Sequence, residues 1–135
     1  MAKLRKQFSI VRKDAAKKIL YGWASVSSVR RSDGSLVPYR DSQGDVIGDD
    51  VMEAMAHDYV EKSRSSRAMH EGGAIGHCIA SLPMTEDVQR ALGVSCDRTG
   101  WFLGLKIDDD ATWDRVVKGE FGGLSIGGTA VYEED

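Results

Sequence analysis

The sequence predicts an α+β fold, a mainly antiparallel β-barrel or strongly curved sheet surrounded by about three helices. Two observations predict it. Short strand-like segments and capped helical segments follow one another in the order β-β-α-β-β-α-β-α-β. Fifteen glycines, many beside predicted strands, indicate tight turns and close backbone contacts. A length of 135 residues fits one domain over residues 1–135, with C-terminal truncation or processing after Asp135 left open.

The N-terminal third predicts a hairpin followed by a loop. Residues 1–18 form a basic strand and turn, in which Phe8–Val11 alternates weakly and Asp14–Lys18 is polar. Ile19–Val26 then resumes as a strand, and Gly22 within it marks a bulge or bend. Residues 30–44 are rich in turn residues and lack periodicity, so an exposed loop is expected there.

The clearest helix is expected from about Val51 to Ser65. Asp50 can cap it, and Glu53 follows three residues later as a capping-box partner. One face is predicted to be buried, formed by Val51, Met55, Tyr59 and the methylene stem of Lys62.

Two short strands and a capped helix are expected next. Residues 68–70 form a strand closed by a turn at residues 71–73, and residues 75–82 form the second strand. Thr85 is expected to cap a helix that runs to about Leu92 and stops at Gly93.

The C-terminal third predicts strand, helix and strand. Trp101–Ile107 is the first strand, and a third helix begins within residues 108–110 and ends at Gly119. That helix is expected to bury Trp113, Val116 and Val117. Gly123–Tyr132 is the last predicted strand.

Composition excludes several classes of protein. A formal net charge of −3 shows no basic excess for nucleic acid, and no apolar run approaches the roughly 18 residues of a membrane span. Nothing is typical of a signal peptide, so a cytosolic protein is expected. Two cysteines, Cys78 and Cys96, are too few for a disulfide framework and are expected to be reduced.

Ser125 lies in a G-x-S-x-G pattern, residues 123–127, which is typical of the nucleophile elbow of α/β-hydrolases. An elbow needs a helix after the serine and a histidine later in the chain. Only ten residues follow, without histidine and with strand character, so the elbow is excluded.

A serine nucleophile also needs a base, and the three histidines all precede it. His57 is expected to be a solvated residue in mid-helix. His70 ends a short apolar segment beside a glycine turn, which suits either an ordinary turn residue or a base aimed at a neighbouring strand. Likewise, the glycines around Ser125 suit either bulges or donors to an oxyanion.

Three segments in order resemble the XkdF-type phage proteases, which belong with the prohead (capsid-maturation) serine proteases. The first is YGWASV at 21–26, followed by DSQGDVI at 41–47. The second is RAMHEGGAIGHCIAS at 67–81, followed by LPMTEDVQRALG at 82–93. The third is GWFLGLKIDDDATWDRVVKGEFGGLSIGG at 100–128.

The resemblance implies an assemblin-like fold, a β-barrel ringed by helices, and a serine endopeptidase with His70 as general base and Ser125 as nucleophile. It implies an orienting acid in the strand after the histidine, where this chain has Ala80. Asp45 or His77 is then the substitute, with Glu133 and a bare dyad as further alternatives. Either Gly127 and Gly128 are the oxyanion donors, or the chain is a truncated or autoprocessed form that lacks part of the active site.

The same resemblance implies the biological setting. The substrates would be phage scaffold and major capsid proteins and the chain itself, cleaved in the bacterial host cytoplasm, inside the assembling prohead. A homodimer is a further possibility. No cofactor, nucleic acid or membrane is implied.

Two other classes compete with a protease. His70, His77, Cys78 and Cys96 carry zinc-ligand atoms, but their spacing matches no zinc motif, and strand alternation separates His77 from Cys78. The second alternative is a catalytically inactive domain that keeps the protease fold within a phage morphogenesis protein, which the missing acid favours.

Overall fold

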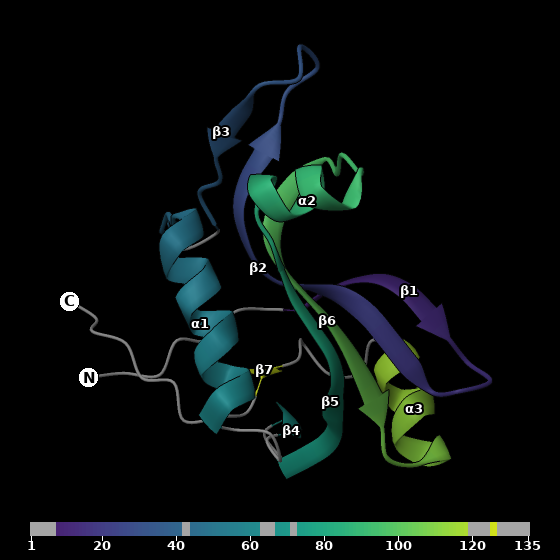
Figure 1. Cartoon of the computed structure of the whole chain (residues 1–135). Coiled ribbons are helices and arrows are strands. Elements are labelled where there is room, and N and C mark those ends of the chain that lie inside the picture. The colour runs from purple at the N-terminus through teal and green to yellow at the C-terminus, as the bar shows by residue number, and fades with distance from the viewer. Residues whose placement is uncertain (1–7, 42–43, 63–66, 71–72, 119–124, 127–135) are drawn as a thin grey trace.

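In the part of the chain that the structure describes, three helices pack beside an antiparallel sheet (Figure 1). The structure is a computed structural model that describes residues 8–41, 44–62, 67–70, 73–118 and 125–126; for 67–70, 73–75 and 125–126 the backbone is described. The strands are β1 Ser9–Asp14, β2 Ile19–Arg30, β3 Leu36–Pro38, β4 Arg67–His70, β5 Gly73–Met84, β6 Arg98–Ile107 and β7 Ser125–Ile126. The helices are α1 Asp49–Lys62, α2 Glu86–Leu92 and α3 Asp110–Val117.

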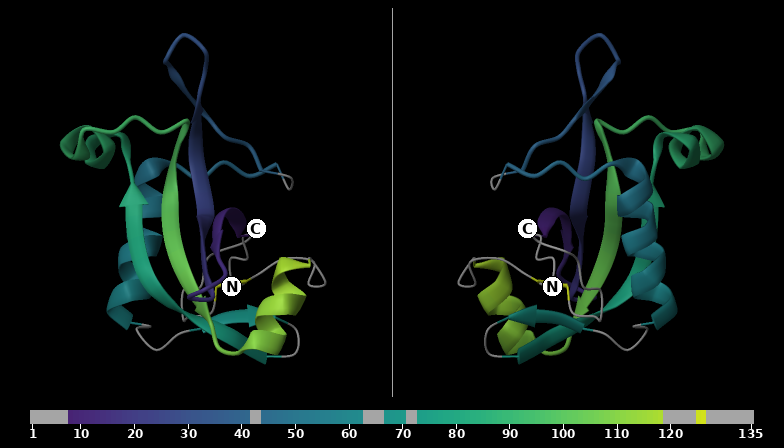
Figure 2. Two further views of the ribbon diagram at one scale, coloured as in Figure 1. Left: turned by 90° about the vertical axis from the view of Figure 1, so that its right-hand side faces the viewer. Right: turned by 90° about the vertical axis from the view of Figure 1, so that its left-hand side faces the viewer.

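The strands pair in the order β1-β2-β6-β5-β4-β7, with β3 paired to one end of β2. All these pairings are antiparallel, and both views of Figure 2 show a strongly twisted sheet. The predicted α+β class with three helices is therefore confirmed. The barrel is not shown, because β1 and β7 end the strand order and do not pair with each other within the described residues.

The predicted N-terminal hairpin is confirmed as β1 and β2. Its turn places Lys18 at φ 58°, and the Asp14 carboxylate accepts the Lys17 N–H at 3.2 Å. Irregularities lie on both sides of Gly22: the register of β1 shifts between Ile10 and Arg12, and the register of β2 to β6 shifts between Trp23 and Ser25. A Cβ on Gly22 would lie 2.1 Å from the Ser9 carbonyl oxygen, so this close approach requires glycine.

The loop predicted for residues 30–44 contains a strand that the prediction missed. β2 continues to Arg30, and β3 pairs with it in register Arg30↔Leu36. Asp33 accepts the Ser35 N–H at 2.9 Å, and Gly34 has φ 91°, so the turn residues close a hairpin instead of forming a structureless loop. The prediction missed β3 because its three residues are too few to show the alternation of apolar and polar side chains that is typical of a strand.

The first helix begins earlier and is rotated relative to its prediction. α1 starts at Asp49, so Asp50 lies inside the helix and is not its cap. Val51, predicted to be buried, is 50% exposed. The buried residues of α1 are Met52, Met55, Ala56 and Tyr59.

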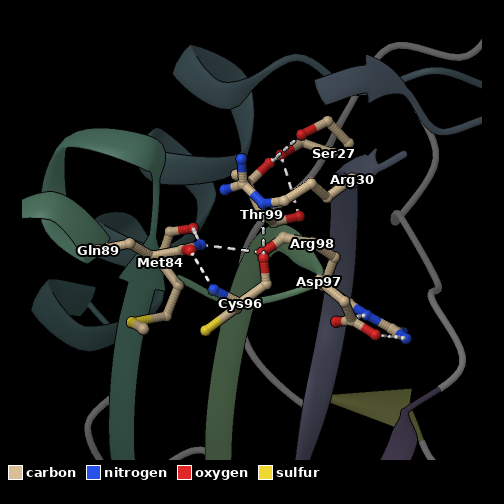
Figure 3. Close-up of polar contacts among 9 residues, drawn as sticks. Ser27, Arg30, Met84, Gln89, Cys96, Asp97, Arg98 and Thr99 are labelled. Carbon is tan, nitrogen blue, oxygen red and sulfur yellow. Dashed lines mark hydrogen bonds and ion pairs between the residues drawn. The ribbon is translucent and has the colours of Figure 1, made fainter. Parts of the chain in front are cut away.

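Hydrogen bonds to the sheet explain where α1 begins. The Asp49 carboxylate accepts the Ser27 hydroxyl at 2.5 Å and the Thr99 hydroxyl at 3.0 Å. Ser27 and Thr99 are buried on β2 and β6, and their hydroxyl oxygens are 2.7 Å apart (Figure 3). A charge-assisted contact of this kind holds the first residue of the helix on the sheet.

The second helix matches its prediction at both ends. The Thr85 hydroxyl accepts the Val88 N–H at 3.2 Å, and Gly93 ends α2 with φ 73°. Gln89, which is 2% exposed, holds the loop between α2 and β6 in place through hydrogen bonds (Figure 3). Its side-chain amide donates to the carbonyls of Met84 at 3.1 Å and Arg98 at 2.9 Å, and accepts the Cys96 N–H at 2.8 Å.

The third helix also follows its prediction. Asp109 caps it by accepting the Thr112 N–H at 2.7 Å, which lowers the pKa of this carboxyl. α3 buries Trp113 and Val116, whereas Val117, also predicted to be buried, is only partly buried against the core. Gly119 lies outside the described residues. So does most of the last predicted strand, of which β7 is the described part.

One hydrophobic core joins the sheet to α1 and α3. Its members from the sheet are fully or almost fully buried: Leu20, Ala24, Trp101, Leu103, Leu105 and Ile107. The helices contribute Met52, Met55, Ala56, Tyr59, Trp113 and Val116, and the Tyr59 and Trp101 rings meet edge to face at 5.3 Å. Burying each large side chain contributes about 1.5–3 kcal/mol.

Replacing Gly22 with alanine is expected to force β1 away from β2. The added methyl would overlap the Ser9 carbonyl, and overpacking of this kind costs about 1–3 kcal/mol. Urea unfolding should show that loss, together with faster amide exchange in β1. The control is Gly48→Ala, where no atom lies within 4 Å of the new Cβ and stability should change by about 1 kcal/mol or less. Equal effects of the two substitutions would contradict this account.

Replacing Gln89 with alanine is expected to destabilise the domain by about 2–3 kcal/mol, because three backbone groups lose their buried partner. Thermal or urea unfolding measures this loss in the free energy of unfolding. Arg90→Ala is the matched control: Arg90 is the next residue, and its exposed ion pairs should contribute less than about 1 kcal/mol. A Gln89→Ala protein as stable as Arg90→Ala would show that the network is dispensable.

Candidate active site

The two residues predicted to carry the chemistry lie on neighbouring strands. Ser125 is the first residue of β7, and His70 is the last residue of β4. The two strands pair antiparallel, in register Ala68↔Ile126 and Met69↔Ser125. The fold therefore brings together, at one edge of the sheet, segments that lie far apart in the sequence.

The register sets a condition on a dyad of Ser125 and His70. Ser125 lies opposite Met69, and His70 is one residue further along β4. Since residues of a regular strand alternate between the two faces, a direct contact requires a departure from regular alternation. At the register shift between β4 and β5 the extra residue is Ile75, between the pairs Ala68↔Gly76 and Met69↔Ala74, so the bulge lies in β5 and not in β4.

β5 connects this edge to the core. One edge of β5 pairs with β4 in register His70↔Gly73, and its other edge pairs with β6 over Gly76–Met84. The β5–β6 approach at Gly76 is close, since a Cβ there would lie 2.3 Å from the Lys106 carbonyl oxygen. The backbone of the candidate site is thus anchored through β5 to the buried strand β6.

His77, one predicted orienting residue, has a different partner. Its Nδ1 lies 3.2 Å from a carboxylate oxygen of Asp108, after β6, and its side chain is 46% exposed. In the register His77 lies opposite Arg67, three residues before His70, which corresponds to about 10 Å along the strand. No local pattern in the sequence indicates the contact with Asp108, because that contact depends on the pairing of β5 with β6.

Asp45, the other predicted orienting residue, is exposed and precedes α1. Its N–H donates to the Asp41 carboxylate at 2.9 Å, and its carbonyl accepts the Asp41 N–H at 2.9 Å. β4 lies near the C-terminal end of α1 in Figure 1, and a helix of 14 residues is about 20 Å long. Asp45 and the end of β4 are therefore at opposite ends of this helix.

Several further predictions concern residues outside the described part of the chain. The predicted oxyanion donors, Gly127 and Gly128, lie there, as does the alternative acid Glu133.

His57 is exposed on α1, as predicted. Among the described residues no helix is long and apolar enough to cross a membrane.

The described cysteines and histidines do not form a metal site. Cys78 and Cys96 are both free, as predicted, and the described residues contain no group of three or more metal-binding side chains. Cys78 packs against the core and its thiol donates to the Ala80 carbonyl, whereas His77 is exposed. Burial raises the pKa of the Cys78 thiol, which disfavours the thiolate that zinc binds.

The family model described as "Putative phage serine protease XkdF" matches residues 8–134. The chain belongs to this family. The match spans both Ser125 and His70, and it confirms the XkdF resemblance inferred from the sequence. Comparisons with curated proteins and with solved structures found no match.

Membership of the XkdF family makes the β4–β7 edge the place to test for a serine protease site. A double variant with Met69→Cys and Ser125→Cys, in a background with Cys78→Ser and Cys96→Ser, is expected to form a disulfide under mild oxidation. Directly opposed residues of antiparallel strands have Cα atoms about 4.5–5.5 Å apart, within disulfide range. Peptide mass spectrometry under non-reducing conditions measures the cross-link.

The control pairs Ser125→Cys with Arg31→Cys in the connection between β2 and β3. That hairpin extends from the other end of the molecule in Figure 1, so no cross-link is expected within the monomer. Absence of the Met69–Ser125 link, with the protein folded, would contradict the register of β4 and β7.

Proposed function

We propose that this protein is a serine endopeptidase that acts in phage head assembly, with Ser125 as nucleophile and His70 as general base. The observation that carries the proposal is the pairing of β4 with β7, which puts the backbone of Ser125 one residue from that of His70 in the register. Membership of the XkdF family supports the same chemistry.

The proposed reaction is acyl transfer. His70 accepts the Ser125 hydroxyl proton while Oγ bonds to the peptide carbonyl carbon, giving a tetrahedral oxyanion. The C–N bond then breaks, and the imidazolium gives its proton to the leaving amine. Water, activated by the same histidine, hydrolyses the acyl-enzyme. Backbone N–H groups of Gly127 and Gly128 are proposed to stabilise the oxyanion, a contribution of about 10²–10³ in rate per donor.

The proposed substrates are phage scaffold and major capsid proteins and the chain itself, cleaved within the assembling prohead in the bacterial host. The proposed reaction needs no cofactor. The protein is also proposed to form a homodimer. Its support is the family match and the resemblance of the three sequence segments to prohead proteases.

A second candidate function, a structural domain without protease activity, has one specific observation in its favour. Neither proposed orienting residue lies beside the end of β4: His77 pairs with Asp108, and Asp45 precedes the far end of α1. An active enzyme would then depend on a bare dyad or on an acid outside the described residues.

A fluorophosphonate probe tests the proposal without knowledge of the cleavage sequence, because it phosphonylates an activated serine. The wild-type protein is expected to be labelled at Ser125, as mapped by mass spectrometry. Ser125→Ala should abolish labelling, and His70→Ala should slow it by about 10⁴-fold, since removing one member of a catalytic unit removes nearly all of its activation.

His57→Ala is the matched histidine control and should be labelled at the wild-type rate, because His57 is exposed on α1. Circular dichroism checks that each variant is folded. Folded wild-type protein that resists the probe and leaves co-expressed scaffold and capsid proteins intact would favour the structural domain. Labelling that survives His70→Ala would refute the assigned base.

A further inference from the structure

The outer edge of β1 is open within the described part of the chain. β1 pairs with β2 along one side, and no other described strand pairs with its second side. Side chains from Ser9 to Lys13 are all exposed. Such an edge presents backbone N–H and C=O groups that can pair with an added strand.

The open edge also exposes apolar side chains. Ile10 is 38% exposed and Val11 is 60% exposed. Val11 is the extra residue where the β1 register shifts, so it lies opposite no residue of β2. Both are β-branched, a type that packs well against a neighbouring strand.

The hairpin of β1 and β2 presents cations to solvent. Arg12 is 64% exposed at its side chain, and Lys13 and Lys17 are also exposed. The acid of this hairpin, Asp14, is 15% exposed and is occupied by Arg12 and by the Lys17 N–H. This positive surface stands out on a chain whose net charge is −3.

The charge selects between possible occupants of the edge. A second copy pairing through β1 would bring two such cationic hairpins together, which is unfavourable. An extended segment rich in Asp or Glu would neutralise Arg12, Lys13 and Lys17 while its backbone pairs with β1. Opposite charge also raises the association rate.

We propose that the open edge of β1 is a docking site for an acidic, extended segment of a partner protein, which adds as a strand beside β1. Its apolar side chains contact Ile10 and Val11, and its carboxylates lie near Arg12, Lys13 and Lys17. β1 and β7 are at opposite ends of the strand order, so this site is distinct from the candidate active site and does not depend on protease activity.

The test measures binding of a fluorescein-labelled peptide, Glu-Val-Glu-Val-Glu-Val-Glu, to the full chain by fluorescence anisotropy at low and physiological salt. The Ser125→Ala protein is used, so that any protease activity leaves the peptide intact. We expect binding that weakens with salt, and at least tenfold weaker binding of a peptide with Lys in place of Glu. A peptide with proline at the central valine, which removes one N–H donor, should also bind about tenfold more weakly.

Matched protein variants locate the site. Lys13→Glu with Lys17→Glu should weaken binding about tenfold. Arg31→Glu with Arg90→Glu makes the same change in charge on the β2–β3 hairpin and on α2, and should change binding less than about twofold. Amide hydrogen exchange should show protection of residues 9–14 when the acidic peptide is bound.

Each other outcome overturns the proposal. Absence of binding removes the site, and equal binding of the proline peptide shows charge attraction without strand addition. Protection at β4 and β7 in place of β1 places the peptide at the other edge. Self-association of the protein alone, with β1 protected, shows that a second copy occupies the edge.

Discussion

The position of β6 between β2 and β5 is the constraint on which the rest of the structure depends. Its core-facing residues Leu103, Leu105 and Ile107 are fully buried beneath the helices, so this strand is excluded from water on its core face. Glycines let its neighbours approach closely: a Cβ on Gly100 would lie 2.3 Å from the Ser25 carbonyl, and one on Gly76 would lie 2.3 Å from that of Lys106. Because β6 comes late in the chain, this pairing joins segments that the sequence separates.

The two edges of the sheet follow from that centre. On one side β2 carries β1, whose exposed cations and apolar side chains suit contact with a partner. On the other side β5 pairs with β4, and β4 pairs with β7, which contains Ser125. The candidate chemistry thus depends on a short ladder held to the core through a single long strand. A shift of one residue in this ladder changes which β4 residue shares a face with the serine.

Polar contacts decide the helix positions in ways that local patterns do not show. Asp50 and Glu53 form a reasonable capping box in the sequence. The helix nevertheless begins at Asp49, because that carboxylate reaches two hydroxyls from distant strands, Ser27 and Thr99. The buried stripe consequently includes Met52 and Ala56, and Val51 faces solvent. By contrast, Thr85 and Gly93 end α2 where predicted, since caps made by adjacent residues are visible in the sequence.

The sequence by itself determined the α+β class, the first hairpin, the caps of α2, the start of α3, and membership of the XkdF family, because these depend on local turn chemistry and on motif order. It also singled out Ser125 and His70. Only the tertiary structure decided that their strands are neighbours, that β1 and β7 do not pair within the described residues, and that His77 pairs with Asp108. The physical reason is that strand register and long-range hydrogen bonds arise from packing around β6, and no short stretch of sequence contains both partners.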